Sequence, residues 1–179
     1  MVLRIARCVN LPFALYTLYF ILYTYLMIIY IGSDHRGFTL KEGLVDYLKS
    51  AGYELIDCGA TTYNEEDDYV DFVSTVARHI SKDPTQRGIV LCGSGVGADV
   101  VANKFDGVRC SLCFTPDHAI AARHDDDVNV LSLPADFVVG DVAKKIVAAW
   151  LQAPFNGGDN YVRRIQKISA IEFENKKSE

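Results

Sequence analysis

One cysteine in this chain stands directly before a glycine-rich turn. Cys92 directly follows the apolar run 88–91. Glycine then alternates with other residues in the loop 93–97, which consists of Gly93, Ser94, Gly95, Val96 and Gly97. Such a loop, continued into a helix, presents backbone N–H groups and the positive end of the helix dipole to whatever lies beside the sulfur. A thiol in that field loses its proton more easily than a free cysteine does. The pattern predicts a base that removes a proton from a small anionic substrate, and a loop that holds the charge that develops.

A second polar turn follows the apolar run 28–31. There Asp34 and His35 form an acid–imidazole pair suited to holding hydroxyls and an anionic group. Taken alone, Asp34 is equally compatible with capping the helix that follows. Two such turns in one sheet, one with Asp and His and one with Cys and glycines, favour a binding site over simple capping.

Two other interpretations fit the sequence less well. The glycines of 93–97 lack the spacing of the dinucleotide fingerprint, and no Walker lysine follows them. Cys110 and Cys113 form a CxxC motif, but residues three apart in a strand point to opposite faces and would chelate a metal poorly. We therefore expect neither a cofactor nor a metal site. The five cysteines are interpreted as reduced thiols of a cytoplasmic protein.

Apolar runs and helical spacing alternate from residue 28 onward. Strands are expected at 28–31, 53–56, 88–91, 108–114 and 128–133, with helices near 40–48, 72–80, 96–104, 116–124, 142–150 and 162–174. Strands separated by helices pair in parallel through right-handed crossovers. This predicts an α/β fold, a three-layer Rossmann-like sandwich with a five-stranded parallel sheet. Because ligands bind beyond the carboxyl ends of such strands, Asp34, His35, Cys92 and the glycine loop should converge on one cleft.

The first 26 residues do not fit this alternation. Arg4 and Arg7 precede the apolar stretch 11–26, which is shorter than the roughly 20 residues that cross a bilayer. No small-residue cleavage site follows it. We expect residues 1–26 to be an N-terminal apolar extension outside the domain, with a membrane anchor as the alternative, and residues 27–179 to form a single domain. The net charge of −5 argues against a nucleic-acid partner.

Five motifs, taken together, resemble those of the type B ribose-5-phosphate isomerases, within the wider family of pentose and galactose-6-phosphate isomerases. They are residues 31–37, 53–59, 67–69, 92–97 and 102–104, in the family's order. The resemblance implies a metal-independent aldose–ketose isomerase that interconverts ribose 5-phosphate and ribulose 5-phosphate through an enediolate. It implies that Cys92 is the base and that the backbone N–H groups of 93–97 hold the oxyanion. The substrate contacts that it implies outside the loop are Asp34, His35, Tyr69, Asn103, Asp126 and Arg164.

The resemblance also bears on assembly. In the family, the residue at Tyr69 reaches into a neighbouring subunit's site, which implies a homodimer, or a dimer of dimers, with shared active sites. The resemblance implies a small sugar phosphate as the substrate, and we do not expect the protein to bind a membrane.

Three positions depart from the family pattern. The histidine that opens the sugar ring aligns with Asp125; we favour His124, one residue earlier, as the catalytic residue, with His118 as the weaker alternative. A phosphate-binding arginine aligns with Asp136. Of two C-terminal arginines, the first aligns with Asn160 and the second with Arg164. The cations available to replace the missing charge are Arg36, Lys41, Arg123 and Arg163.

These departures leave other functions open. One alternative is an isomerase of another small sugar or sugar phosphate, and another is a sugar-phosphate-binding protein that has lost catalysis. A hydrolase with a cysteine nucleophile is the least favoured, because no histidine stands at a recognisable motif spacing.

Overall fold

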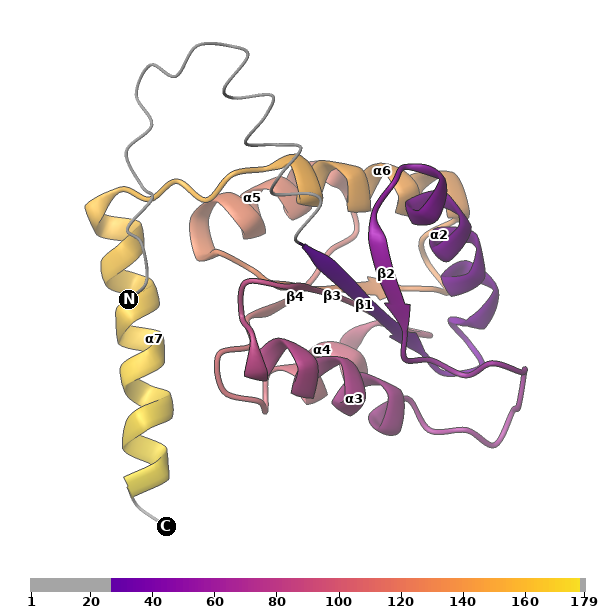
Figure 1. The fold of residues 1–179 in the computed structure, drawn as a ribbon, viewed down its shortest axis with the longest axis horizontal. Helices are drawn as coiled ribbons and strands as arrows, with labels where there is room; N and C mark the ends of the chain where they lie inside the picture. Colours follow the sequence, from indigo (N-terminus) through magenta and orange to yellow (C-terminus); the bar gives the residue numbers. More distant parts are fainter. Residues whose placement is uncertain (1–26, 178–179) are drawn as a thin grey trace.

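Five parallel strands form one sheet, and helices cover both of its faces (Figure 1). The computed structural model describes residues 27–177, so the prediction for residues 1–26 lies outside the described part. The strands are β1 (Ile28–Ser33), β2 (Glu54–Asp57), β3 (Arg87–Cys92), β4 (Cys110–Leu112) and β5 (Val130–Pro134). Their order across the sheet is β2-β1-β3-β5-β4. The predicted α/β fold with a five-stranded parallel sheet is confirmed, and β3 is its central strand.

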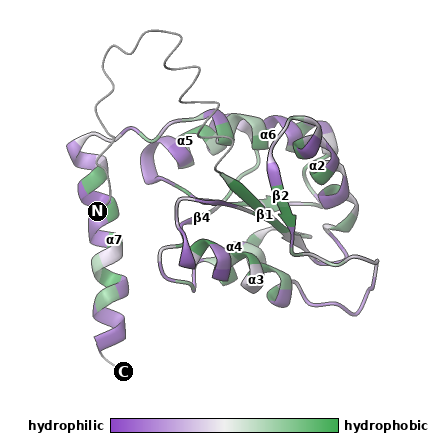
Figure 2. Ribbon diagram, in the orientation of Figure 1, coloured by the Kyte–Doolittle hydropathy of each residue, from purple (hydrophilic) through white to green (hydrophobic). Residues whose placement is uncertain are grey.

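The helices form two layers. On one face lie α2 (Phe38–Ser50), α5 (Pro116–Asp126) and α6 (Gly140–Gln152), and on the other lie α3 (Tyr69–Lys82) and α4 (Val96–Ala102). Alternate residues of β3 divide between them: Ile89 and Leu91 pack under the first layer, and Val90 and Cys92 under the second. Figure 2 shows the hydrophobic strand β1 enclosed between the two layers. The thiol of Cys92 therefore belongs to the α3–α4 side.

The edge strand is shorter than expected. The apolar run 108–114 predicts a buried strand, but β4 spans only Cys110–Leu112, and all three of its residues are half-buried. The expectation of burial was wrong because β4 is the last strand of the sheet and has one hydrogen-bonded neighbour, β5. Cys110 packs in the α3–α4 core and Cys113 in the opposite one, so the two thiols do face opposite sides.

The last helix, α7 (Asp159–Lys177), stands apart from both layers (Figure 1). None of its residues is buried, and Ile168, Ile171 and Phe173 expose 38%, 58% and 58% of their surface. Within residues 27–177, no helix combines the length and hydrophobicity needed to cross a bilayer.

The direction of the chain assigns each helix end to one edge of the sheet. We call the edge where the strands end the carboxyl edge and the opposite one the amino edge. In a parallel sheet, each connecting helix starts at the carboxyl edge and returns the chain to the amino edge. The first residues of α3, α4 and α5 therefore lie at the carboxyl edge with Cys92, and their last residues lie at the amino edge, on the side of α7 (Figure 1).

Candidate active site

Cys92 is the last residue of β3 and is 4% exposed. The loop that follows it is fixed from the end of β5: the N–H groups of Ala135 and Asp136 donate to the carbonyls of Cys92 and Gly93 at 3.0 and 2.9 Å. The Ser132 hydroxyl donates to the Gly95 carbonyl at 2.8 Å. Because the loop is held by a neighbouring strand, its backbone keeps one conformation beside the thiol.

Gly95 shows why this loop needs glycine. Its φ of 73° lies in the left-handed region, and a Cβ atom built on it would overlap the Leu112 side chain. The next residues begin α4, and the Val96 N–H donates to the Ser94 hydroxyl at 3.3 Å. Ser94 and Val96 are both exposed at the carboxyl edge.

Tyr69 lies against the glycine loop of its own subunit. A Cβ atom built on Gly97 would come within 2.6 Å of the Tyr69 ring and 2.8 Å of its hydroxyl oxygen. The contact follows from the topology, because Tyr69 is the first residue of α3, and the first turns of α3 and α4 share the carboxyl edge. That Tyr69 also reaches into a neighbouring subunit's site stays a prediction.

Asp34 closes the turn before α2, whereas the helix itself has Gly37 as its N-cap residue and no side-chain cap. One of its carboxylate oxygens accepts the N–H groups of Arg36 and Gly37, both at 3.1 Å, and the residue is 4% exposed. Burial raises the pKa of the Asp34 carboxyl, opposed mainly by the hydrogen bond from Gly37. Asp34 therefore shapes the turn that carries His35.

His35 is held by an acid to which the sequence argument gave no role. Its Nδ1 lies 2.7 Å from Asp67 Oδ1, and its backbone N–H donates to the same oxygen at 2.8 Å. The side-chain bond to Asp67 is the main reason that the pKa of His35 is raised above its ordinary value. Asp67 Oδ2 is buried without a hydrogen-bond partner. Asp67 lies 32 positions away on the loop before α3, so no local spacing indicates the pair.

The four cations that could replace the missing phosphate-binding arginines differ in their partners and in their exposure. Lys41 is fully buried, and its ammonium contacts Asp57 and Glu42 at 2.5 and 2.7 Å and the Ala60 carbonyl at 3.1 Å. Arg123 forms an ion pair with Asp127 at the end of α5. Arg163 is exposed on α7. Arg36 pairs with Asp136 at the carboxyl edge, next to Gly93.

The predicted ring-opening residue belongs to a second cluster, at the amino edge. His124 lies in the last turn of α5, with Nδ1 2.7 Å from Asp125 Oδ1 and Nε2 3.3 Å from the Asn156 amide nitrogen. The amide donates to Nε2, so Nδ1 carries the proton that is donated to Asp125, as assigned from this network. The Tyr161 ring meets His124 edge-on at 6.0 Å and lies 5.5 Å from the Arg164 guanidinium. Tyr161 thus brings His124 and Arg164 together.

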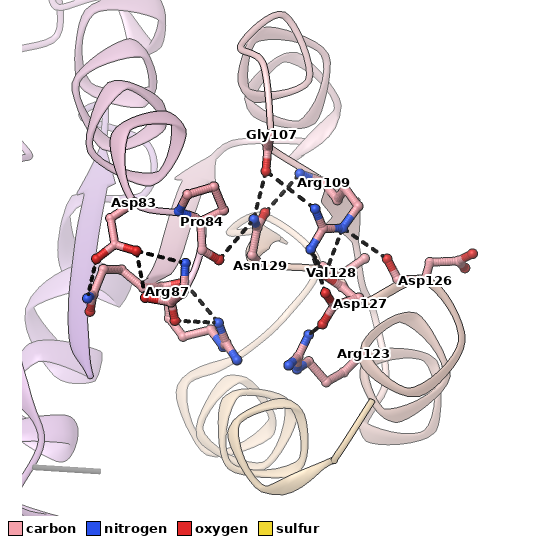
Figure 3. A network of polar contacts seen from close by, with 12 residues as sticks. Asp83, Pro84, Arg87, Gly107, Arg109, Arg123, Asp126, Asp127, Val128 and Asn129 are labelled. Carbon is pink, nitrogen blue, oxygen red and sulfur yellow. Dashed lines mark hydrogen bonds and ion pairs between the residues drawn. The ribbon is translucent and has the colours of Figure 1, made fainter. Parts of the chain in front are cut away.

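A polar network fixes the turn after α5 (Figure 3). Asp127 ends the helix in the left-handed conformation, with φ 50°, and its carbonyl and carboxylate accept from the Arg109 guanidinium. Asn129 is fully buried: its amide oxygen accepts the Arg109 N–H at 2.8 Å and its amide nitrogen donates to the Gly107 carbonyl at 2.8 Å. Asp126 remains exposed just before this turn.

Asn103, which the resemblance implies as a substrate contact, forms hydrogen bonds that hold the edge strand. Its amide oxygen accepts the Cys110 N–H at 2.8 Å, and its amide nitrogen donates to the Cys110 carbonyl at 3.1 Å. The side chain therefore ties the end of α4 to the edge strand β4 and lies away from Cys92. It also borders a cavity of about 630 Å³ between β4, α5 and α7, together with His118, Asp125 and Asp126.

The predicted site residues thus fall into two groups. Asp34, His35, Tyr69, Cys92 and the loop 93–97 share the carboxyl edge, as the sequence predicts. The residues at the amino edge are Asn103, His124, Asp126 and, through Tyr161, Arg164. Within one chain the sheet separates the Cys92 thiol from His124, the predicted ring-opening residue.

The whole described domain resembles known proteins. A family model described as ribose/galactose isomerase matches residues 29–168. The Escherichia coli protein named ribose-5-phosphate isomerase B is 41% identical over 141 residues, which cover 79% of this chain and 93% of that protein. The Mycobacterium tuberculosis protein of the same name is 36% identical over 146 residues, covering 82% and 90%.

Solved structures give the same result. Ribose-5-phosphate isomerase B from Mycoplasma genitalium, with bound ribulose-5-phosphate, superposes with a TM-score of 0.81 at 39% identity, over 83% of this chain and 98% of that one. The Clostridium thermocellum ribose-5-phosphate isomerase B has a TM-score of 0.79 at 42% identity, over 83% and 99%.

Proposed function

Because this chain belongs to the ribose/galactose isomerase family, we propose that Cys92 is the base with which it interconverts ribose 5-phosphate and ribulose 5-phosphate. The observation that carries the proposal is the position of this thiol, at the end of the central strand and directly before a loop fixed from β5. The other described cysteines are poor candidates. Burial raises the pKa of Cys58 to about 11 and also raises the pKa values of Cys110 and Cys113, so those thiols stay protonated at neutral pH.

The reaction that this arrangement supports is a proton transfer between neighbouring carbons. The Cys92 thiolate removes the proton from C2 of the open-chain aldose, and the electron pair of that bond forms the C1–C2 double bond while the carbonyl oxygen becomes an oxyanion. Backbone N–H groups of the loop 93–97 stabilise this oxyanion. The thiol then returns the proton to C1, and a proton moves from O2 to O1, which gives the ketose and regenerates the thiolate.

We infer that the active unit is a dimer in which each site takes residues from both chains. Cys92 and His124 lie at opposite edges of one sheet, so a complete site needs His124 from another copy. Two surfaces favour such a copy: the edge strand β4 has an open side, and α7 exposes Ile168, Ile171 and Phe173. In this arrangement His124, oriented by Asp125, opens the sugar ring, and Arg164 lies close enough to contact the same substrate.

Exchange in deuterated water tests the base. Ribose 5-phosphate is incubated with the protein, and ribulose 5-phosphate formation and deuterium uptake at carbon are followed together. Cys92→Ala is expected to abolish both signals, whereas Cys58→Ala, which removes the thiol just after β2, should retain them. Product formation by Cys92→Ala would disprove the assignment of the base. Absence of turnover and exchange in the wild-type protein would disprove the isomerase function and favour a binding protein.

Mixing two inactive variants tests the shared site. Cys92→Ala and His124→Ala are unfolded and refolded together, so that hybrid dimers form. If sites are shared, each hybrid contains one intact site, and about a quarter of the wild-type activity returns. Sites built within one chain would give no recovery, and a sedimentation measurement that finds a monomer would exclude sharing outright.

A further inference from the structure

An ion pair spans the end of the strand that carries Cys92. Arg36 follows β1 and Asp136 follows β5, and these are the two strands that flank β3. The guanidinium Nη2 of Arg36 meets Asp136 Oδ2 across 100 positions of sequence. The pair therefore lies across the carboxyl end of the central strand.

The pair is in close contact with the residue after Cys92. A Cβ atom built on Gly93 would overlap the Nε and Cζ atoms of Arg36 and lie 2.8 Å from Asp136 Oδ2. The Asp136 N–H also donates to the Gly93 carbonyl. Because Gly93 has no side chain, the guanidinium rests directly on the backbone of the loop, one residue from the thiol.

The guanidinium keeps donors for a ligand. Its side chain is 56% exposed, and the ion pair with Asp136 is made by Nη2, which carries only two of the five N–H donors of the guanidinium. An exposed ion pair of this kind is weak, so a phosphate dianion can compete with Asp136 for the guanidinium. Lys41, the other cation that follows β1, is buried and bound to Asp57.

We propose that Arg36 is a specificity-determining residue of this site: it binds the phosphate of the sugar, and Asp136 positions its guanidinium over Gly93. The proposal rests on the proposed isomerase function. In the family pattern, a phosphate-binding arginine aligns with position 136, where this chain has an aspartate. The proposal assigns that phosphate-binding role to Arg36. A side chain at position 136 can reach the place that the Arg36 guanidinium occupies, because the Asp136 carboxylate already lies beside Gly93.

Exchanging the two positions tests the assignment. Arg36→Ala is expected to raise KM for ribose 5-phosphate and the inhibition constant of inorganic phosphate by about 10-fold or more, as the loss of a charge-assisted bond predicts, with a smaller change in kcat. The double variant Arg36→Ala/Asp136→Arg should recover most of both losses, because it returns a cation to the same place. Lys49→Ala, which removes one exposed charge at the far end of α2, serves as the control and should match the wild type.

The outcomes separate the two proposals. If Arg36→Ala retains the wild-type KM and phosphate inhibition while isomerisation proceeds, the role of Arg36 is disproved and the function stands. If the wild-type protein does not isomerise ribose 5-phosphate, calorimetric titration with inorganic phosphate still tests Arg36. Binding that is lost in Arg36→Ala and restored in the double variant supports the phosphate assignment alone. Equal binding by all variants overturns it.

Discussion

His35 and Asp67 form an ion pair in which one carboxylate oxygen fixes both the ring and the backbone of the histidine. Asp67 Oδ1 lies 2.7 Å from His35 Nδ1 and 2.8 Å from the His35 backbone nitrogen. The pair joins the loop before α3 to the turn after β1, and so sets the position of the imidazole at the carboxyl edge. Because Nδ1 faces Asp67, Nε2 is the nitrogen left for a ligand.

Asp67→Asn is expected to lower the pKa of His35 towards its ordinary value of 6.5, because the hydrogen bond to Asp67 is the largest cause of the raised pKa. Because the pKa of His35 is higher in the folded than in the unfolded state, binding of a proton to His35 stabilises the fold. This stabilisation is fully present below about pH 6.5 and is lost as the pH rises through the folded-state pKa. NMR titration of His35 measures the shift. Asp68→Asn, at the neighbouring carboxylate that caps α3, is the control and should leave the titration unchanged. An unchanged pKa in Asp67→Asn would show that Asp67 does not govern His35.

Asp34→Asn should be at least as stable as the wild type at pH 7. Burial raises the pKa of Asp34, so its ionised form weakens folding; the difference should shrink as the pH falls through the raised folded-state pKa and vanish below 3.8. The amide oxygen can still accept the N–H groups of Arg36 and Gly37, whereas Asp34→Ala removes both hydrogen bonds of the turn and should cost about 1–3 kcal/mol. Urea unfolding of both variants measures this. A lower stability of Asp34→Asn at pH 7 would contradict the prediction, and a loss of activity in a stable Asp34→Asn would support a contact with substrate.

Gly97→Ala should destabilise the glycine loop, since the added methyl group would push against the Tyr69 ring. Because the contacted atoms lie at the far end of the Tyr69 side chain, which can shift, the cost is at the low end for an overpacked contact, about 1 kcal/mol. Adding Tyr69→Ala should remove most of the extra cost, which a double-mutant cycle of unfolding free energies detects. The matched control is Gly43→Ala: Gly43 lies inside α2 with nothing near its Cβ position, and the substitution should stabilise by about 0.5–1 kcal/mol. Additive effects at positions 69 and 97 would mean that the two residues do not interact.

Asn129→Ala should lower the free energy of unfolding by at least about 2 kcal/mol, because the Arg109 N–H and the Gly107 carbonyl lose their partner (Figure 3). Thermal and urea unfolding measure the loss. Asn160→Ala, at an exposed position of α7, should change stability by less than about 0.5 kcal/mol. A small effect at Asn129 would show that the turn after α5 is held by the Arg109–Asp127 pair without the buried amide.

Residues close together in sequence were the predictable part of this protein. The alternation of apolar runs and helical spacing determined the five strands and their parallel pairing, because both patterns depend only on neighbours along the chain. The same argument assigned Cys92, its glycine loop, Asp34 and His35 to strand ends, and hence to one edge of the sheet. The length of β4 was overestimated because its hydrophobic pattern does not reveal that it lies at the edge.

Tertiary structure decided which distant residues meet. The strand order made β1 and β5 the neighbours of β3, and this brings Arg36 and Asp136 together over Gly93. The order of parallel strands does not follow from residue spacing, because it depends on packing across the whole sheet. The return of α5 to the amino edge, which separates His124 from Cys92, follows from the parallel alternation once α5 is known to connect β4 to β5. The sequence by itself assigned the proposed base, Cys92, and its glycine loop to the carboxyl edge; the fold decided which cation lies over that loop, because only the strand order sets β1 and β5 on either side of β3.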